Sequence, residues 1–77
     1  MIEIEQQARI ICNKNYVGLE EFEKDIEQVF SDSYKKARIF IRVCMLEGSE
    51  RIKKFMFASG VITNFINKHT TRLHSDV

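Results

Sequence analysis

Apolar residues recur at helical spacing in the first half of this chain. Before the turn-prone sequence NKN at 13–15, one helical face would carry Ile4, Ala8, Ile11 and Cys12. The next segment, GLEEFEKDIEQVF at 18–30, places a longer set on one face: Leu19, Phe22, Ile26, Val29 and Phe30. Acidic residues crowd its first turn, where they complement the positive end of the helix dipole. Both segments are therefore predicted to be amphipathic helices.

The stretch YKKARIFIRVCML at 34–46 fits two structures. Alternation typical of a strand is seen in Ile39, Ile41, Val43 and Met45. A single polar stripe typical of a helix is formed by Lys35, Arg38 and Arg42. The length favours a helix, with Asp32 or Ser33 as its N-cap. The alternative is a β-hairpin at about 38–58, in which this stretch pairs with RIKKFMF across the turn EGSE.

Glycine and serine divide the rest of the chain into two further helices. In the helical version Gly48 is a C-cap and Ser49 caps a short helix that runs to Gly60, with a core face of Ile52, Phe55 and Met56. The last helix is expected to bury Ile62, Phe65, Ile66 and His69, with Leu73 continuing the face. Proline is absent and there are only three glycines, which disfavours a many-turned β-protein. The predicted fold is all-α, a compact orthogonal bundle of four to five short helices in a single domain, residues 1–77.

The N-terminus and the cysteines bear on location. The opening MIEIEQQARI has neither a basic region nor a long apolar run, so it is not predicted to be a secretory signal. The most apolar stretch is interrupted by Arg38 and Arg42 and is too short to span a bilayer. Cys12 and Cys44 lie in apolar surroundings without short spacing, which favours reduced core thiols in a cytoplasmic protein. A disulfide between them is the alternative.

Charge is distributed unevenly along the chain. Up to Ser33, eight acids against three bases give a net charge of −5, whereas nine bases against three acids from Tyr34 onward give +6. Such asymmetry indicates either a basic binding surface or two halves that attract each other, within the fold or across a homodimer.

The segment FASGVITNFINKH at 57–69 loosely resembles a helix-turn-helix, with Gly60 at the turn and Val61 and Ile66 as apolar anchors. Met56 stands where that motif usually has alanine, and His69 stands where an apolar residue suits it better. Four residues on the outward face belong to types that can contact DNA bases: Thr63, Asn64, Asn67 and Lys68. Phosphate contacts would come from Lys53, Lys54 and Arg72. The alternative function is therefore a small DNA-binding transcriptional regulator that uses residues 50–72. The competing interpretation is that Gly60 marks only a bend between two packed helices and that the polar face is simply solvated.

Neither catalysis nor metal binding is predicted. The chain contains no phosphate-binding glycine loop, HExxH, CxxC or GxSxG. His69 and His74 are five residues apart and would lie on different faces of one helix. Glu20, Glu23 and Glu27 share a helical face, which is the pattern of a solvated outer face. We expect no enzyme activity, cofactor or metal.

Large apolar side chains point to a protein partner. Six phenylalanines, two tyrosines and three methionines exceed what a small bundle easily buries. Phe57 is expected at the edge of its helix, either as an exposed anchor or packed against Phe40 or Phe65. We therefore expect a small inhibitor, anti-factor or adaptor, of the kind that phages and mobile elements use, docking its basic and aromatic half on an acidic partner. The candidate partner-binding residues are Arg42, Arg51, Lys53, Lys54 and Phe57.

Overall fold

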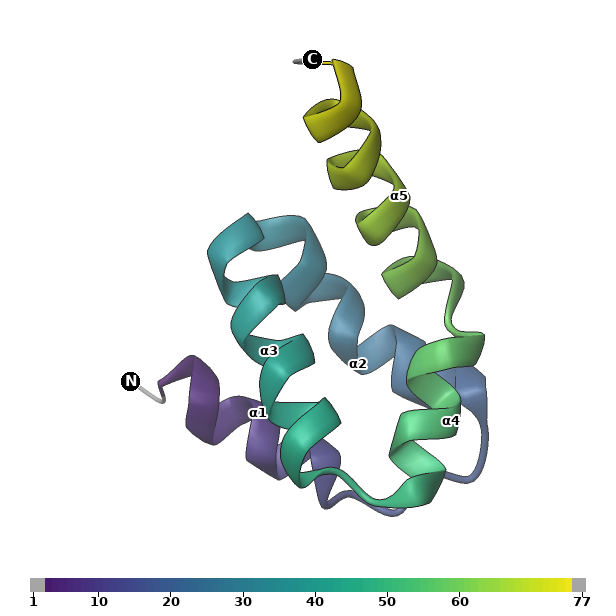
Figure 1. The fold of residues 1–77 in the computed structure, drawn as a ribbon. Coiled ribbons are helices and arrows are strands. Elements are labelled where there is room, and N and C mark those ends of the chain that lie inside the picture. The colour runs from purple at the N-terminus through teal and green to yellow at the C-terminus, as the bar shows by residue number, and fades with distance from the viewer. Residues whose placement is uncertain (1–2, 76–77) are drawn as a thin grey trace.

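The chain folds into helices throughout the computed structural model, which describes the backbone of residues 3–75 and the side chains of residues 3–69 (Figure 1). The helices are α1 (Ile4–Cys12), α2 (Leu19–Asp32), α3 (Tyr34–Glu47), α4 (Glu50–Ala58) and α5 (Gly60–Ser75). Residues 3–75 contain no strand. The predicted all-α fold is confirmed, and the alternative hairpin at about 38–58 is wrong because that stretch forms α3 and α4.

Local signals set the two ends of α3. The Ser33 hydroxyl accepts a hydrogen bond from the backbone N–H of Lys36 at 3.4 Å, which confirms the predicted N-cap. At the other end the N–H of Gly48 donates to the carbonyl oxygen of Cys44 at 2.9 Å. A Cβ atom at Gly48 would overlap that oxygen, so this position needs glycine for space. The strand-like alternation was misleading because α3 places Val43 in the core and leaves Met45 exposed.

The helices pack around one core in which α3 is central. In Figure 1, α3 packs against α1, and α2 lies behind α3. Helix α4 lies at the lower right, and α5 begins where α4 ends and extends upward. Every helix contributes to the core, which contains Ala8, Ile11, Cys12, Phe22, Ile26, Val29, Phe40, Val43, Cys44, Ile52, Met56 and Ile62, together with Tyr16 from the loop before α2. The last turns of α5 extend beyond the other helices (Figure 1).

A disulfide joins Cys12 of α1 to Cys44 of α3. The two Cα atoms are 5.9 Å apart, within the usual range for this bond, and both residues are buried in the core. The expectation of reduced thiols is therefore wrong, and the alternative pairing is the one found. Tertiary packing brings together two residues that lie 32 positions apart in the sequence.

The loop between α1 and α2 is held by a buried tyrosine. The Tyr16 hydroxyl donates a hydrogen bond to Oδ2 of Asp25 at 2.7 Å, and Lys14 Nζ lies 2.8 Å from the same oxygen. Burial, followed by the carboxylate of Asp25, raises the pKa of Tyr16. The hydrogen bonds from Lys14 and Tyr16 lower the pKa of Asp25. These contacts fix the entry of the chain into α2.

Only one residue separates α4 from α5. Ser59 has extended backbone angles, and Gly60 is already the first residue of α5. Within residues 3–75 no glycine has a positive φ, so Gly60 does not adopt the left-handed backbone that a helix-turn-helix would need there. The Ser59 hydroxyl accepts a hydrogen bond from the N–H of Ile62 at 3.3 Å. Side-chain capping, and not glycine geometry, therefore produces this bend.

Aromatic side chains anchor the first half of α5. The Phe65 ring packs on Phe30 at 5.2 Å and on Tyr34 at 5.5 Å between ring centroids. The His69 ring lies 4.2 Å from that of Tyr34. Ile62 is buried as expected, but Ile66 is 46% exposed, so its predicted place on the core face is wrong. The face that α5 presents to α2 and α3 passes through Phe65 and His69 and leaves Ile66 to one side.

Candidate interaction surface

Phe57 is a large apolar side chain that α4 leaves in solvent. It is 76% exposed, whereas Ile52 and Met56 on the opposite side of the helix are buried. The helical repeat places Phe57 beside Lys53, four residues away, and Lys54, three residues away. Phe40 and Phe65 each pack against Phe30, so the alternative in which they bury Phe57 is wrong. The predicted exposure of Phe57 is confirmed, and its role in binding remains a prediction.

The three basic residues of α4 have different surroundings. Lys54 is exposed and has no ion-pair partner among residues 3–69. Lys53 Nζ lies 3.7 Å from Oε1 of Glu50, in the same helix. Arg51 donates to the carbonyl oxygens of Tyr16 at 2.9 Å and Val17 at 3.1 Å, and it stacks over the Phe55 ring. The guanidinium of Arg51 therefore holds the loop before α2 against α4.

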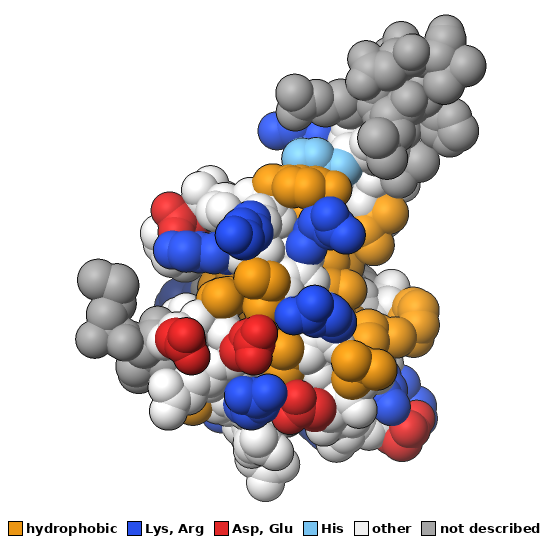
Figure 2. All heavy atoms as spheres, turned by 60° about the vertical axis from the view of Figure 1, so that its left-hand side comes forward, with side chains coloured by type: hydrophobic (Ala, Val, Ile, Leu, Met, Phe, Trp, Pro, Cys, Tyr) orange, Lys and Arg blue, Asp and Glu red, His pale blue; other side chains and the backbone are white. Residues whose placement is uncertain are grey.

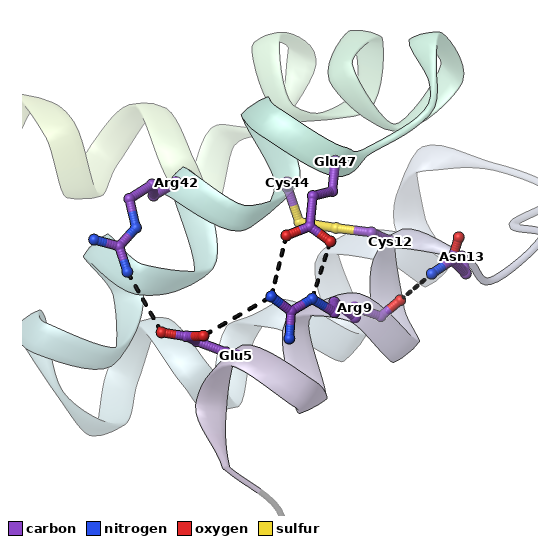
Figure 3. Close-up of polar contacts among 7 residues, drawn as sticks. All are labelled: Glu5, Arg9, Cys12, Asn13, Arg42, Cys44 and Glu47. Atoms are coloured by element: carbon purple, nitrogen blue, oxygen red, sulfur yellow. Dashed lines mark hydrogen bonds and ion pairs between the residues drawn. A yellow bond between two sulfur atoms is a disulfide. The ribbon is translucent and has the colours of Figure 1, made fainter.

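Arg42, the fifth candidate, belongs to a chain of ion pairs between α1 and α3 (Figure 3). Its Nη2 lies 3.5 Å from Glu5, and Glu5 lies 3.8 Å from Arg9. Arg9 in turn donates two hydrogen bonds to the carboxylate of Glu47, at 2.9 and 3.2 Å. The hydrogen bond from Arg9 lowers the pKa of Glu47. All four side chains are about half exposed. These ion pairs therefore orient α1 and α3 relative to each other more than they stabilise the fold.

A second candidate surface lies on α3, and Arg42 is its only member among the predicted partner-binding residues. The α3 outer face consists of Tyr34, Lys35, Arg38, Ile39, Ile41, Arg42, Met45 and Leu46. Leu46 is 75% exposed, Tyr34 46% and Met45 36%. A hollow of about 490 Å³ is lined by Tyr34, Lys35, Arg38, Ile39 and Arg42. Figure 2, which turns the left-hand side of Figure 1 forward, shows basic side chains interleaved with hydrophobic ones, and acidic ones gathered beside them.

The signal for this face is present in the sequence. Lys35, Arg38 and Arg42 were identified as one stripe of a helix, and the same geometry places Met45 and Leu46 next to that stripe. From the sequence, Met45 belongs only to the strand-like alternation and Leu46 has no assignment. Only the packing of α1 and α2 on the opposite side of α3 distinguishes exposed from buried apolar positions here.

The candidate DNA-reading residues occupy one side of α5. Thr63, Asn64, Asn67 and Lys68 are exposed, and the Arg72 side chain lies outside the described residues. Asn64 and Lys68 line a hollow of about 280 Å³ together with Glu27 of α2. The acidic side of α2 therefore lies next to the proposed reading face, where a DNA phosphate backbone would meet like charge.

A carboxylate on α2 caps the start of α5. Oε2 of Glu23 accepts a hydrogen bond from the buried Ser59 hydroxyl at 2.8 Å and another from the N–H of Val61 at 3.3 Å. The hydrogen bond from Ser59 is the main cause that lowers the pKa of Glu23, with smaller contributions from the backbone N–H groups of Val61 and Gly60. An anion at this position also complements the helix dipole.

Acid is expected to weaken the fold through Glu23. Because the folded pKa is lowered, the ionised carboxylate stabilises the fold above its ordinary pKa of 4.5, and this stabilisation is lost as the pH falls through the lower folded value. Urea unfolding at about pH 7 and at about pH 3 should therefore show a smaller pH-dependent loss in Glu23→Gln than in the wild type. Glu27→Gln, one turn along α2, is the matched control. Equal losses in the wild type and Glu23→Gln would contradict this role.

Other kinds of site are not found in the part of the chain that the structure describes. No group of three His, Cys, Asp or Glu side chains gathers closely enough to hold a metal ion there. None of the described helices combines the length and apolar character that crossing a membrane requires. No protein family, curated protein or solved structure matches this chain. Its function is therefore argued from the exposed surfaces of α3, α4 and α5.

Proposed function

We propose that this chain is a small non-enzymatic interaction domain that docks its basic and aromatic C-terminal half on an acidic surface of a larger protein. The observation that carries the proposal is Phe57, three-quarters exposed on α4 beside Lys53 and Lys54. Burying a phenylalanine side chain from water contributes about 2 kcal/mol or more, and aromatic anchors surrounded by polar residues are typical of interface hot spots. An exposed phenylalanine does not stabilise the isolated domain.

Electrostatics supports an acidic partner. Lys35, Arg38 and Lys54 are exposed and have no ion-pair partner among residues 3–69. Unpaired charges around an apolar anchor accelerate and orient the encounter with a surface of opposite sign. An inhibitor, anti-factor or adaptor of the phage or mobile-element type is the specific form that we propose.

We also propose that the protein acts in the cytoplasm. The cysteine argument no longer supports it, because the structure pairs Cys12 with Cys44 and disulfides persist mainly in oxidising compartments.

DNA binding is the second candidate. It is favoured by the exposure of Thr63, Asn64 and Asn67 on one side of α5. Two observations weigh against it, namely the absence of a left-handed turn at Gly60 and the position of Glu27 beside Asn64 and Lys68. We therefore rank it below the protein partner.

Affinity capture from cells that naturally make the protein tests the proposal. We expect a stable one-to-one complex that Phe57→Ala weakens about 30-fold, the effect of losing a 2 kcal/mol hot spot. Combined Lys53→Glu and Lys54→Glu should also weaken it, whereas Ile10→Ala on α1 and Lys24→Glu on α2 are matched controls that should retain it.

Retention of every partner by the Phe57 and lysine variants would show that this surface is not the one used. A labelled mixed-sequence DNA duplex, titrated at low and physiological salt, is the parallel measurement. Micromolar, salt-sensitive binding that is lost in Asn64→Ala with Asn67→Ala would favour the DNA alternative.

A further inference from the structure

Two neighbouring rows of side chains run along the outward side of α3. One row contains Tyr34, Arg38, Ile41 and Met45, and the other contains Lys35, Ile39, Arg42 and Leu46. Both rows follow the spacing i, i+4, i+7, i+11, which keeps their members on one side of a helix. Each row therefore brings an arginine between apolar positions, and the two rows together make a face about three turns long.

The α3 outer face exposes apolar side chains to water, which is unfavourable. Leu46 and Tyr34 are exposed at 75% and 46%, and Ile39 and Ile41 are only half-buried. The opposite side of α3 already packs against α1 and α2 through Phe40, Cys44 and their neighbours. Among residues 3–69, α5 reaches the Tyr34 end of this face through Phe65 and His69, and the other end, at Met45 and Leu46, is left exposed.

The basic groups of the face are largely unused within the fold. Lys35 and Arg38 form no ion pair with residues 3–69, and Arg38 lies over the Tyr34 ring at 5.7 Å. Arg42 has one pair, with Glu5 at 3.5 Å, and its side chain is still 62% exposed. Three cations therefore line the hollow together with Tyr34 and Ile39.

We propose that an acidic amphipathic helix of the protein partner lies along the α3 outer face. Its apolar side would cover Tyr34, Met45 and Leu46, and its acidic residues would pair with Lys35, Arg38 and Arg42. The face spans 34–46, a length of about 18 Å at 1.5 Å per residue, which matches a helical segment of about three turns. This inference rests on the proposed function and names the surface and the kind of segment it binds.

Other occupants fit this face less well. A second copy of the chain would offer its acidic α2, but every exposed residue of α2 is polar, so it has nothing to cover Leu46. DNA would pair with the cations and leave the apolar positions uncovered. An anionic membrane is wider than a single helix, so besides the cations it would also meet Glu5, which pairs with Arg42, and Glu47, which pairs with Arg9 (Figure 3).

Site-specific photo-crosslinking in the cells that make the protein tests the proposal. A photoreactive amino acid is placed at position 46 or 57, and at position 17 as a control of matched exposure, where Val17 is 84% exposed in the loop before α2. We expect position 46 to crosslink one protein through a segment that is acidic and has apolar residues at helical spacing, and position 17 to give no such product.

Affinity for the crosslinked segment, made as a labelled synthetic peptide, gives the second measurement. Lys35→Glu with Arg38→Glu should weaken peptide binding about tenfold or more and reduce its salt dependence, because both charges face the acidic helix. Lys24→Glu, on α2, should bind as the wild type does. Circular dichroism checks that each variant keeps its helices.

The remaining outcomes separate this inference from the proposed function. Crosslinks to a protein from position 57 but not from position 46 would overturn the α3 assignment and leave the proposed function standing. Crosslinks from position 46 to lipid, nucleic acid, a second copy or a segment without acidic residues would overturn the stated partner. No protein crosslink from either position would overturn both.

Discussion

Reduction of the Cys12–Cys44 disulfide is expected to lower the free energy of unfolding by about 3 to 4 kcal/mol. The bond closes a loop between residues 32 positions apart, which removes conformational entropy from the unfolded chain. Small domains bury limited surface and have total stabilities near the lower end of about 5 to 15 kcal/mol, so this loss is a large fraction of the whole. Urea unfolding with and without a dithiol reductant, followed by circular dichroism, measures it.

A double variant, Cys12→Ala with Cys44→Ala, is the control for the reductant. It should unfold at the same urea concentration in both conditions, well below that of the oxidised wild type. If the wild type is equally stable with and without reductant, the disulfide does not support the fold as argued.

Replacement of Phe22 by alanine is expected to cost about 3 to 5 kcal/mol. Phe22 is fully buried, and its ring meets those of Tyr16 at 5.5 Å and Phe55 at 5.7 Å between centroids. Its removal would leave a cavity where α2, α4 and the loop before α2 meet, and neighbouring side chains fill such a cavity only in part. The midpoint of urea unfolding under oxidising conditions gives the change in stability.

Phe57→Ala is the matched control for this measurement. Because Phe57 is 76% exposed, its loss should change the stability by no more than about 0.5 kcal/mol, while partner binding weakens about 30-fold. A cost for Phe57→Ala close to that of Phe22→Ala would mean that Phe57 packs in the interior and cannot be a docking anchor.

The candidate surface was predictable from the sequence only in part. Phe57 was placed correctly because three residues at helical spacing, Ile52, Phe55 and Met56, define the opposite side of α4. Nothing in the sequence near Arg51 indicates that its guanidinium donates a hydrogen bond to the carbonyl oxygen of Tyr16, 35 positions away. Backbone acceptors in a loop have no sequence signature, so this contact becomes visible only when the loop is positioned against α4.

The bend before α5 was also predictable from the sequence only in part. The sequence indicated a bend at Gly60, and its helix-turn-helix interpretation required a left-handed backbone there. In the structure Ser59 caps α5, and Glu23 from α2 accepts a hydrogen bond from the Ser59 hydroxyl across 36 positions of sequence. The carboxylate satisfies the first N–H groups of α5, so no special backbone geometry is needed.

The sequence by itself predicted α1, α2 and α5 and favoured α3 and α4 over a hairpin. It also indicated the capping at Ser33 (with Asp32 as the alternative), Gly48 and Ser49, because helical periodicity and capping act between residues a few positions apart. Tertiary structure alone decided the Cys12–Cys44 bond, the role of Arg51 and the exposure of the α3 outer face. These depend on which sides of the helices face each other. That choice is made by burial of apolar surface over the whole chain, which local spacing does not specify.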